Sequence, residues 1–187
     1  MLYKCYAQNI IENMEKQLSH NEFKEVQKEI NNPSVIVLDE LDHCENIGSA
    51  FRIADVFNFS GIIIISKSSL DMNKIKKTAR SCERHIPYMV FNNAETALKY
   101  LDDNGFTKIA LEITNKSKSL REVNFARLGK LALIVGNENY GVSENVLCQI
   151  DGAVHIDMYG KNSSMNVATA LAIAGYKMTE DYLRSED

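Results

Sequence analysis

Short apolar runs alternate with amphipathic stretches along most of the chain. Six of these runs are unbroken rather than period-two, which is typical of strands buried on both faces; they are Ser34–Leu38, Ile62–Ile65, Tyr88–Phe91, Lys108–Ile113, Leu131–Val135 and Ala153–Ile156. Helical spacing predicts helices at Ile47–Phe57, Asn73–Ser81, Ala94–Asp103 and Met165–Leu183. This alternation predicts an α/β fold in which helices cover both faces of a parallel sheet. It does not predict the order of the strands.

The first thirty residues carry a helical pattern of their own. Apolar residues from Ile10 to about Ile30 form one stripe, which the polar triplet Ser19-His20-Asn21 divides into two helices. The segment Asn31-Asn-Pro33 ends it, because proline disfavours a helical residue before it. We therefore expect a helical extension over residues 1–32 and one compact domain over residues 33–187.

The size and charge of the chain set broad limits on its function. Its 187 residues suit a single domain, and its formal net charge of −4 argues against indiscriminate polyanion binding while leaving room for a local basic surface. The longest apolar run is far too short to span a bilayer. No secretory apolar region follows Met1, and the four cysteines stand singly, so reduced thiols and a cytoplasmic location are expected.

Two glycine-bearing loops follow strands near the C-terminus. Leu131–Val135 runs directly into Gly136-Asn-Glu-Asn-Tyr-Gly-Val-Ser143, where Ser143 is suited to begin a helix. Ala153–Ile156 runs into Asp-Met-Tyr-Gly-Lys-Asn-Ser-Ser164 and then a long alanine-rich helix. Because the carboxyl ends of parallel strands hold ligands in open α/β sheets, a binding site built late in the chain is expected.

Common nucleotide and metal motifs do not occur in the sequence. A dinucleotide-binding fold has G-x-G-x-x-G after its first strand, where this chain reads Asp39-Glu-Leu-Asp-His-Cys-Glu-Asn-Ile-Gly48. No G-x-x-x-x-G-K-[ST] phosphate loop is found either. His43 and Cys44 are adjacent and have no spaced partner pair, so no metal site is expected.

The segment Asn46-Ile-Gly-Ser-Ala-Phe-Arg52 follows the first predicted strand. Taken alone, it favours a structural interpretation in which Asn46 caps a helix beginning at Ile47 and Arg52 is a surface residue. Gly48 costs a helix about 1 kcal/mol relative to alanine. Its presence indicates that another group approaches the backbone closely at this point.

Together with Gly136-Asn-Glu-Asn-Tyr-Gly-Val-Ser143 and Ser164-Met-Asn-Val-Ala168, this segment resembles the SpoU (TrmH) family of RNA ribose 2′-O-methyltransferases, part of the SPOUT superfamily. The motifs of that family have the forms N-x-G-x-x-x-R, G-N-E-x-x-G-V-S and I-P-M-x-G-x-x-x-S-L-N-V-S. All three occur here in the right order. The resemblance implies a parallel α/β sheet with a C-terminal trefoil knot, and a homodimer with its site near the subunit interface.

The resemblance also assigns roles to single residues. The catalytic set that it implies is Asn46, Arg52, Glu138, Ser164 and Asn166. The residues that it implies around the cofactor, S-adenosylmethionine, are Leu111, Gly136, Ile156, Met158, Ser164 and Met165. Three positions of the third motif depart from the family pattern: Asp157 replaces the usual proline, Met165 the usual leucine and Ala168 the final serine. Asp157 places an additional carboxylate beside the cofactor loop.

A ribose 2′-hydroxyl is a poor nucleophile, so an enzyme must position it and favour its alkoxide. Because the pKa of arginine exceeds about 12, we expect Arg52 to stabilise the alkoxide and grip a phosphate, although a role as the base stays open. Asn46 and Glu138 would orient Arg52 and the ribose. A structural alternative stays open for each of these residues. Glu138 would stabilise the turn near the helix that begins at Ser143, and Ser164 and Asn166 would form a helix N-terminus.

A 2′-hydroxyl target restricts the substrate to RNA rather than DNA, and the sequence does not distinguish tRNA from rRNA. Candidate phosphate-binding residues are basic and gather in three places; they are Lys74, Lys76, Lys77, Arg80 and Arg84, then Lys116, Lys118 and Arg121, and finally Lys161. Two other functions remain open. One is a catalytically inert RNA-binding scaffold, and the other is a knotted methyltransferase that acts on a base atom.

Overall fold

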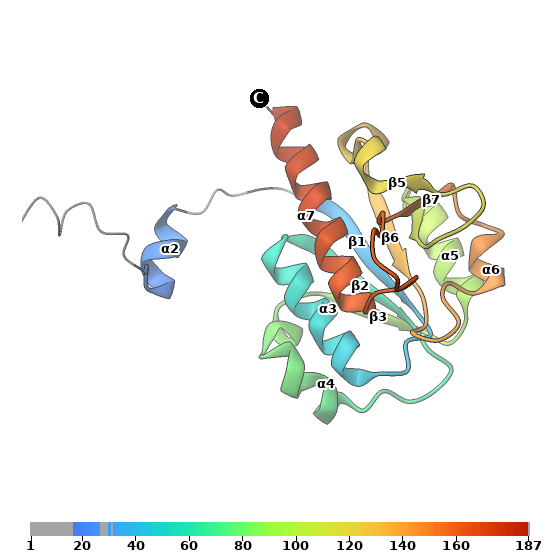
Figure 1. Cartoon of the computed structure of the whole chain (residues 1–187). Coiled ribbons are helices and arrows are strands. Elements are labelled where there is room, and N and C mark those ends of the chain that lie inside the picture. Colours follow the sequence, from blue (N-terminus) through green and yellow to red (C-terminus); the bar gives the residue numbers. More distant parts are fainter. Residues whose placement is uncertain (1–16, 27–29, 31, 187) are drawn as a thin grey trace, which may run out of the picture.

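A computed structural model describes residues 17–26, 30 and 32–186 of the chain. Its centre is a seven-stranded sheet in which all neighbouring strands are parallel. In the order of the sheet, the strands are β3 (Tyr88–Phe91), β2 (Phe59–Ile65), β1 (Asn32–Asp39), β6 (Leu131–Val135), β4 (Thr107–Leu111), β7 (Gly152–His155) and β5 (Lys118–Ser119) (Figure 1). The carboxyl ends of all these strands therefore meet at one edge.

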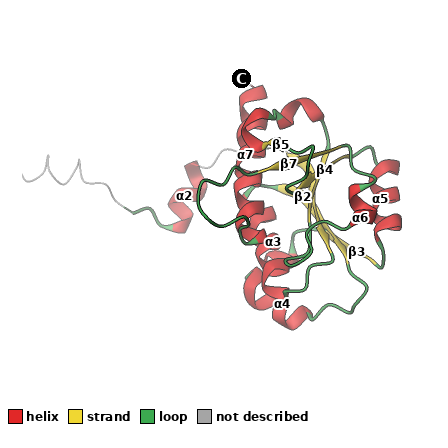
Figure 2. Ribbon diagram, turned by 45° about the vertical axis from the view of Figure 1, so that its right-hand side comes forward, coloured by secondary structure: helices red, strands yellow, loops and turns green. Residues whose placement is uncertain are grey.

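Helices cover both faces of the sheet (Figure 2), as the sequence predicted. One face carries α3 (Cys44–Val56), α4 (Met72–Ala79) and α7 (Val167–Glu186), and the other carries α5 (Ala94–Asp103) and α6 (Glu144–Leu147). Three short 3₁₀ turns, η1 (Cys82–Arg84), η2 (Leu120–Glu122) and η3 (Phe125–Leu128), lie in the connections. Among the described residues, no helix has both the length and the apolar content needed to cross a membrane.

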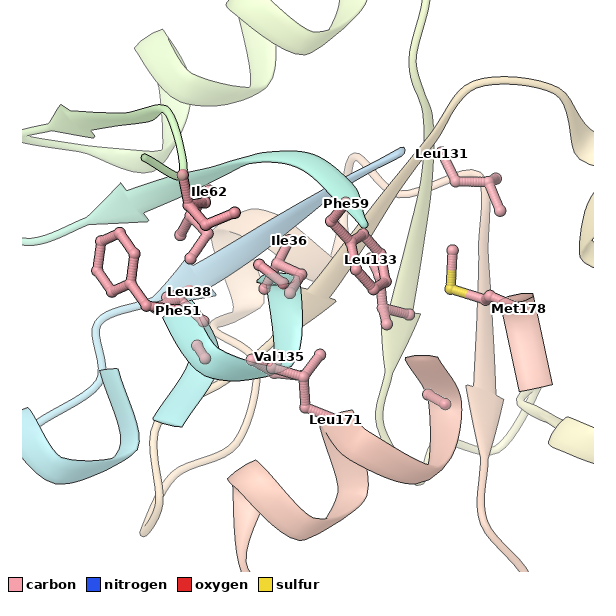
Figure 3. Close-up of a cluster of buried hydrophobic side chains, with 14 of the residues drawn as sticks. Ile36, Leu38, Phe51, Phe59, Ile62, Leu131, Leu133, Val135, Leu171 and Met178 are labelled. Carbon is pink, nitrogen blue, oxygen red and sulfur yellow. The ribbon is translucent and has the colours of Figure 1, made fainter. Parts of the chain in front are cut away.

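Strand β1 shows why its sequence is apolar without alternation. Ile36 lies in a fully buried cluster that includes Phe51 of α3 and Leu171 of α7 (Figure 3). Its neighbour Val37 points to the opposite face and lies in a second cluster with Leu98 of α5. Because side chains alternate along a strand, a sheet buried on both faces requires an apolar residue at nearly every position.

The ends of the predicted strands and helices agree with the structure to within three residues. Strand β5 and the 3₁₀ turns were not predicted, because segments of two to four residues are too short to show a hydrophobic period. Of the predicted N-terminal helices, only α2 (His20–Val26) falls among the described residues. The rest of that prediction, from Ile10 onward, lies largely outside the described residues.

The close approach predicted at Gly48 is present, and the approaching element is α4. A Cβ atom at Gly48 would lie 2.6 Å from the carbonyl oxygen of Ile75 and 2.7 Å from Cβ of Thr78. Both atoms belong to α4, so any larger residue would push the two helices apart. The glycine therefore allows α3 and α4 to pack closely, and the segment that begins at Asn46 is held firmly against α4.

The order of the strands places the ends of four of them side by side. The chain runs outward from β1 through β2 to β3 and then returns to the other half of the sheet. As a result β1, β6, β4 and β7 are consecutive in the sheet although they are scattered along the sequence. In such sheets the crevice beyond the carboxyl ends, near the point where the strand order reverses, is the usual ligand site.

Candidate functional site

A cavity of 480 Å³ lies at the carboxyl ends of these four strands. It is lined by residues that follow β1, β4, β6 and β7 and by the start of α7. All six residues that the sequence pointed to for the cofactor are in its lining, namely Leu111, Gly136, Ile156, Met158, Ser164 and Met165. Its volume falls in the range of roughly 300–1,000 Å³ that is typical of small-molecule sites.

The loop after β6 is fixed by its two glycines. A Cβ atom at Gly136 would lie 2.1 Å from the backbone atoms of Gly141 and Val142, so no other residue fits there. Asn137 and Gly141 exchange two backbone hydrogen bonds of 3.0 and 2.9 Å. Gly141 has a φ of 69°, a left-handed conformation that costs glycine little. This tight turn forms one wall of the cavity.

Glu138, at the tip of that turn, accepts hydrogen bonds from the start of α3. Its carboxylate lies 3.0 Å from the backbone nitrogen of Asp42, 3.2 Å from that of His43 and 2.7 Å from Nδ2 of Asn46. Burial alone would raise the pKa of Glu138, but these hydrogen bonds together outweigh it and hold the pKa below its usual value. The carboxylate is thus kept ionised at a helix N-terminus, where a negative charge is favoured.

The structural roles expected for Asn46 and Glu138 differ from those in the structure. Helix α3 begins at Cys44, so Asn46 lies inside its first turn and does not cap it. The capping position is held by His43, which makes no side-chain cap hydrogen bond. The plain role considered for Glu138 was wrong in its partner, because the carboxylate binds the N-terminus of α3 and not that of α6.

Asn166 links the third motif to the first. Its Oδ1 accepts hydrogen bonds from the backbone nitrogens of Ala168 (2.9 Å) and Thr169 (3.2 Å), which is how a residue caps a helix such as α7. Its Nδ2 donates to Oδ1 of Asn46 at 3.2 Å. Asn166, Asn46 and Glu138 therefore form a continuous chain of hydrogen bonds along the cavity wall.

The remaining two residues of the implied catalytic set lie differently. Ser164 lines the cavity. Arg52 is exposed on α3, nearly two helical turns beyond Asn46, and is not in the lining of the cavity. A single chain thus brings together Asn46, Glu138, Ser164 and Asn166, and leaves the guanidinium of Arg52 on the solvent side.

Three acidic or histidine residues of the cavity lining were not predicted as site residues from the sequence. Glu112, directly after β4, accepts hydrogen bonds from the backbone nitrogens of Val142 (3.0 Å) and Ile113 (2.8 Å), and its carboxylate lines the cavity. His43 and His155 line it as well. The signal for all three was available, because each stands at the carboxyl end of an apolar strand or in the loop that follows.

The departure at Asp157 builds a contact of its own. Its Oδ2 accepts hydrogen bonds from Oγ of Ser119 (2.6 Å) and from Nε of Arg121 (3.1 Å), and it lies 2.9 Å from the Nη2 atom of Arg121. The hydrogen bond from Ser119, followed by the contacts with Arg121, holds the pKa of Asp157 below its usual value. These bonds tie the loop between β7 and α7 to the neighbouring strand β5.

The carboxylate of Asp39 also holds the loop after β6 in place. Asp39, at the end of β1, is 1% exposed, and its Oδ2 accepts a hydrogen bond of 2.8 Å from the backbone nitrogen of Ser143. Burial raises the pKa of Asp39 above its usual value, although the bond from Ser143 acts in the opposite direction. Ser143 occupies the capping position of α6, so the helix start predicted there is confirmed.

One cluster of potential metal ligands lies outside the cavity. Asp55, Cys82 and His85 bring one ligand atom each within 4.8 Å of one another. Nε2 of His85 lies 2.7 Å from Oδ1 of Asp55, so these two side chains already satisfy each other. Burial, followed by the nearby charge of Asp55, raises the pKa of Cys82 and disfavours the thiolate that a metal needs. The geometry is explained by a surface hydrogen-bond cluster.

The family model described as the SpoU rRNA Methylase family matches residues 33–176. The chain belongs to this family. Among curated relatives of this SpoU family member, the "Putative TrmH family tRNA/rRNA methyltransferase" of Staphylococcus saprophyticus is 30% identical over 146 residues, which cover 78% of the chain and 57% of the relative. The chain therefore spans less than two thirds of the length of that relative.

Solved structures show that the SpoU family member also has the family fold. The SpoU methyltransferase AviRb from Streptomyces viridochromogenes, solved in complex with AdoMet, matches with a TM-score of 0.75 and 19% identity, over 84% of this chain and 63% of that chain. A structure concerned with 2-OH methylation of C/U34 on tRNA matches with a TM-score of 0.71 and 24% identity, over 81% of this chain and 97% of that chain.

Proposed function

We propose that this SpoU family member is an RNA methyltransferase that moves a methyl group from S-adenosylmethionine to a ribose 2′-hydroxyl. The observation that carries the proposal is the hydrogen-bonded chain of Asn166, Asn46 and Glu138, which joins three distant motifs beside one cavity. Two comparisons support it. AviRb was solved with AdoMet, and the structure concerned with 2-OH methylation has nearly its full length covered by this chain.

The cavity fits this cofactor in size and in chemistry. Its lining contains apolar side chains suited to an adenine ring, among them Leu111, Ile156 and Met165. It also contains the carboxylates of Glu112 and Glu138. S-adenosylmethionine carries a positively charged sulfonium and supplies an electrophilic methyl group. Two carboxylates in one cavity favour a ligand with positive charge, because opposite charges attract most strongly where water is scarce.

The residues around the cavity would divide the work of methyl transfer. The chain of Asn166, Asn46 and Glu138 would hold the ribose hydroxyl in line, since a positioned nucleophile needs less activation. Ser164 would support the cofactor loop. As the new oxygen–carbon bond forms and the sulfur–carbon bond breaks, the hydroxyl proton would pass to a substrate phosphate or to water.

We assign Arg52 to the RNA side of the site. It is exposed on α3 and outside the cofactor cavity, which suits a group that meets the substrate rather than the cofactor. A guanidinium binds phosphate oxygens in a bidentate way and stabilises a developing alkoxide electrostatically. The same role does not require arginine to lose its proton.

We further propose the architecture that the family resemblance implies. Residues 33–187 would form the methyltransferase domain with a C-terminal trefoil knot, and residues 1–32 would form a helical extension. The active form would be a cytoplasmic homodimer whose second subunit completes the site around Arg52. The RNA, tRNA or rRNA, would be bound through basic surfaces. Helix α4 and turn η1 offer one such surface, with Lys76, Lys77 and Arg80 exposed.

Mass spectrometry of nucleosides tests this function. RNA from a strain that lacks the gene should lose one 2′-O-methylated nucleoside, and the wild-type gene should restore it. A missing methyl on a base would instead identify a base methyltransferase. Calorimetry of the purified protein with S-adenosylmethionine separates these enzymes from an inert RNA-binding scaffold, which would show no heat of binding.

A further inference from the structure

Two tyrosines stand at the rim of the cavity with their rings in solvent. Tyr140, in the loop after β6, is 87% exposed, and Tyr159, in the loop after β7, is 82% exposed. Their chain neighbours Asn139, Gly141 and Met158 line the cavity. Large aromatic rings bury well in a core, so two rings displayed at the mouth of one site indicate a surface for binding.

Tyr140 is presented on a rigid turn. Oδ1 of Asn137 accepts hydrogen bonds from the backbone nitrogens of Asn139 (2.9 Å) and Tyr140 (3.3 Å). Nδ2 of Asn137 in turn donates to the carbonyl oxygen of Glu40 at 2.7 Å. With the paired hydrogen bonds between Asn137 and Gly141, these contacts fix the backbone on both sides of the ring. A fixed backbone leaves less entropy to be lost when a ligand stacks on the ring.

Tyr159 is held by a neighbouring side chain. Nη2 of Arg121 donates to the Tyr159 hydroxyl at 2.6 Å, and the guanidinium carbon lies 5.9 Å from the centre of the ring. Arg121 is fixed by Asp157, which belongs to the same loop as Tyr159. The carboxylate at the position of the usual proline therefore orients both the arginine and, through it, the tyrosine.

The sheet order places the two loops that carry the rings after the two strands on either side of β4. Strands β6 and β7 flank β4, and neighbouring strands lie about 4.8 Å apart, so the two loops begin roughly 10 Å from each other. Three exposed lysines follow the neighbouring strands. Lys161 lies two residues after Tyr159 in the same loop, whereas Lys116 and Lys118, between β4 and η2, line a separate pocket. In the described part of the chain no ion pair joins any of these lysines to an acid.

We propose that Tyr140 and Tyr159 are stacking platforms for unpaired bases of the RNA on either side of the target nucleotide. Single-stranded RNA is bound by stacking bases on aromatic rings while basic residues follow its phosphates. Both rings lie at this mouth, and the exposed Lys161 lies in the same loop as Tyr159. The proposal rests on the proposed function, in that it takes RNA as the substrate of the site.

Binding of a single-stranded RNA tests the platforms without depending on methyl transfer. The probe is a fluorescein-labelled 15-nucleotide RNA of mixed sequence, measured by fluorescence anisotropy in the presence of S-adenosylhomocysteine. Tyr140→Ala and Tyr159→Ala should each raise the Kd for this RNA about tenfold, in line with the loss of one stacked base. Tyr140→Phe keeps the ring and should stay within about twofold of the wild-type protein. Tyr159→Phe keeps the ring but loses the hydrogen bond from Arg121, so it should raise the Kd less than Tyr159→Ala does. The same RNA annealed into a duplex should bind more weakly to the wild-type protein.

Calorimetry with S-adenosylhomocysteine serves as the control, because cofactor affinity should be unchanged in all four variants. An unchanged RNA Kd in both alanine variants, or no binding of the single-stranded probe by the wild-type protein, overturns the proposal. So does a shift of the alanine variants from dimer to monomer with an unchanged RNA Kd, which would assign the rings to a subunit contact. If the wild-type protein transferred no methyl group to RNA but the alanine variants still weakened RNA binding, the result would contradict the proposed function and not the platforms.

Discussion

Nδ2 of Asn46 lies 2.7 Å from Oε1 of Glu138, although 92 residues separate the two in sequence. The same carboxylate receives the backbone N–H groups of Asp42 and His43. One side chain in the loop after β6 therefore satisfies three donors from the segment after β1. Removing it would leave those donors without their protein partner, at a cost that is largest for the partly buried amide of Asn46.

Glu138→Ala should lower the free energy of unfolding by about 1–3 kcal/mol, because it removes three hydrogen bonds to a carboxylate, of which the one from Asn46 is partly buried. Urea denaturation of the variant and the wild-type protein measures this difference. The matched control is Glu122→Ala, which removes an exposed glutamate in η2 and should change stability by less than about 0.5 kcal/mol. Equal stability of the two variants would show that the contacts of Glu138 contribute nothing to the fold.

The depressed pKa of Glu138 predicts a pH dependence of stability. Because the folded pKa lies below the unfolded one, the unfolded chain takes up the proton more readily. The stabilisation from this group is therefore complete above the unfolded pKa, about 4.3 for glutamate, and is lost as the pH falls through the lower folded pKa. Unfolding free energies measured from pH 6 to pH 3 should fall less steeply for Glu138→Gln than for the wild-type protein. Parallel curves would contradict the assignment.

Gly136→Ala should disrupt the cofactor cavity, because the added Cβ would sit 2.1 Å from the backbone of Gly141 and Val142. We expect a loss of several kcal/mol in stability and at least a tenfold weaker affinity for S-adenosylmethionine by calorimetry, as an overpacked site must shift its backbone. Gly160→Ala, in the loop after β7, is the control, since a Cβ there has no atom within 4 Å. A variant at Gly136 that binds as tightly as the control would refute this packing argument.

Arg52→Ala should reduce methyl transfer to RNA by at least a hundredfold while leaving the Kd for S-adenosylmethionine within about threefold, because Arg52 lies outside the cofactor cavity. A methylation assay with RNA from the deletion strain, paired with calorimetry, separates the two effects. Arg127→Ala removes another exposed arginine, in η3, and should leave transfer near the wild-type rate. If Arg52→Ala lost cofactor binding and stability together, the residue would be structural.

The hydrophobic pattern predicted the strands and helices well because most of the sheet is buried on both faces, so its strands stand out as unbroken apolar runs. It did not predict β5, whose two residues show no period. Nor did it predict the strand order, which depends on contacts between segments such as β1 and β6 that lie far apart in sequence. Local patterns carry little information about such pairings.

The site residues, like the elements of the fold, were predicted only in part from the sequence. The resemblance to the family motifs pointed to Asn46, Glu138 and Asn166, and the structure joins them by hydrogen bonds. Glu112 was missed, because a single acid after a strand has no distinctive spacing. Taken alone, its motif indicated that Arg52 is a surface residue, and the structure confirms that it is exposed. Helical periodicity places it on a face of α3, but which face meets the cavity is decided by the packing of α3 against α4 and α7.

The position of β6 between β1 and β4 has a consequence for how the molecule is made. During synthesis β1, β2 and β3 leave the ribosome first and can pair with one another, but the free edge of β1 waits for Leu131–Val135. Contacts between such distant segments form slowly, because a long loop must close first. The nascent chain therefore carries an open sheet edge, prone to wrong partners, until β6 has been translated.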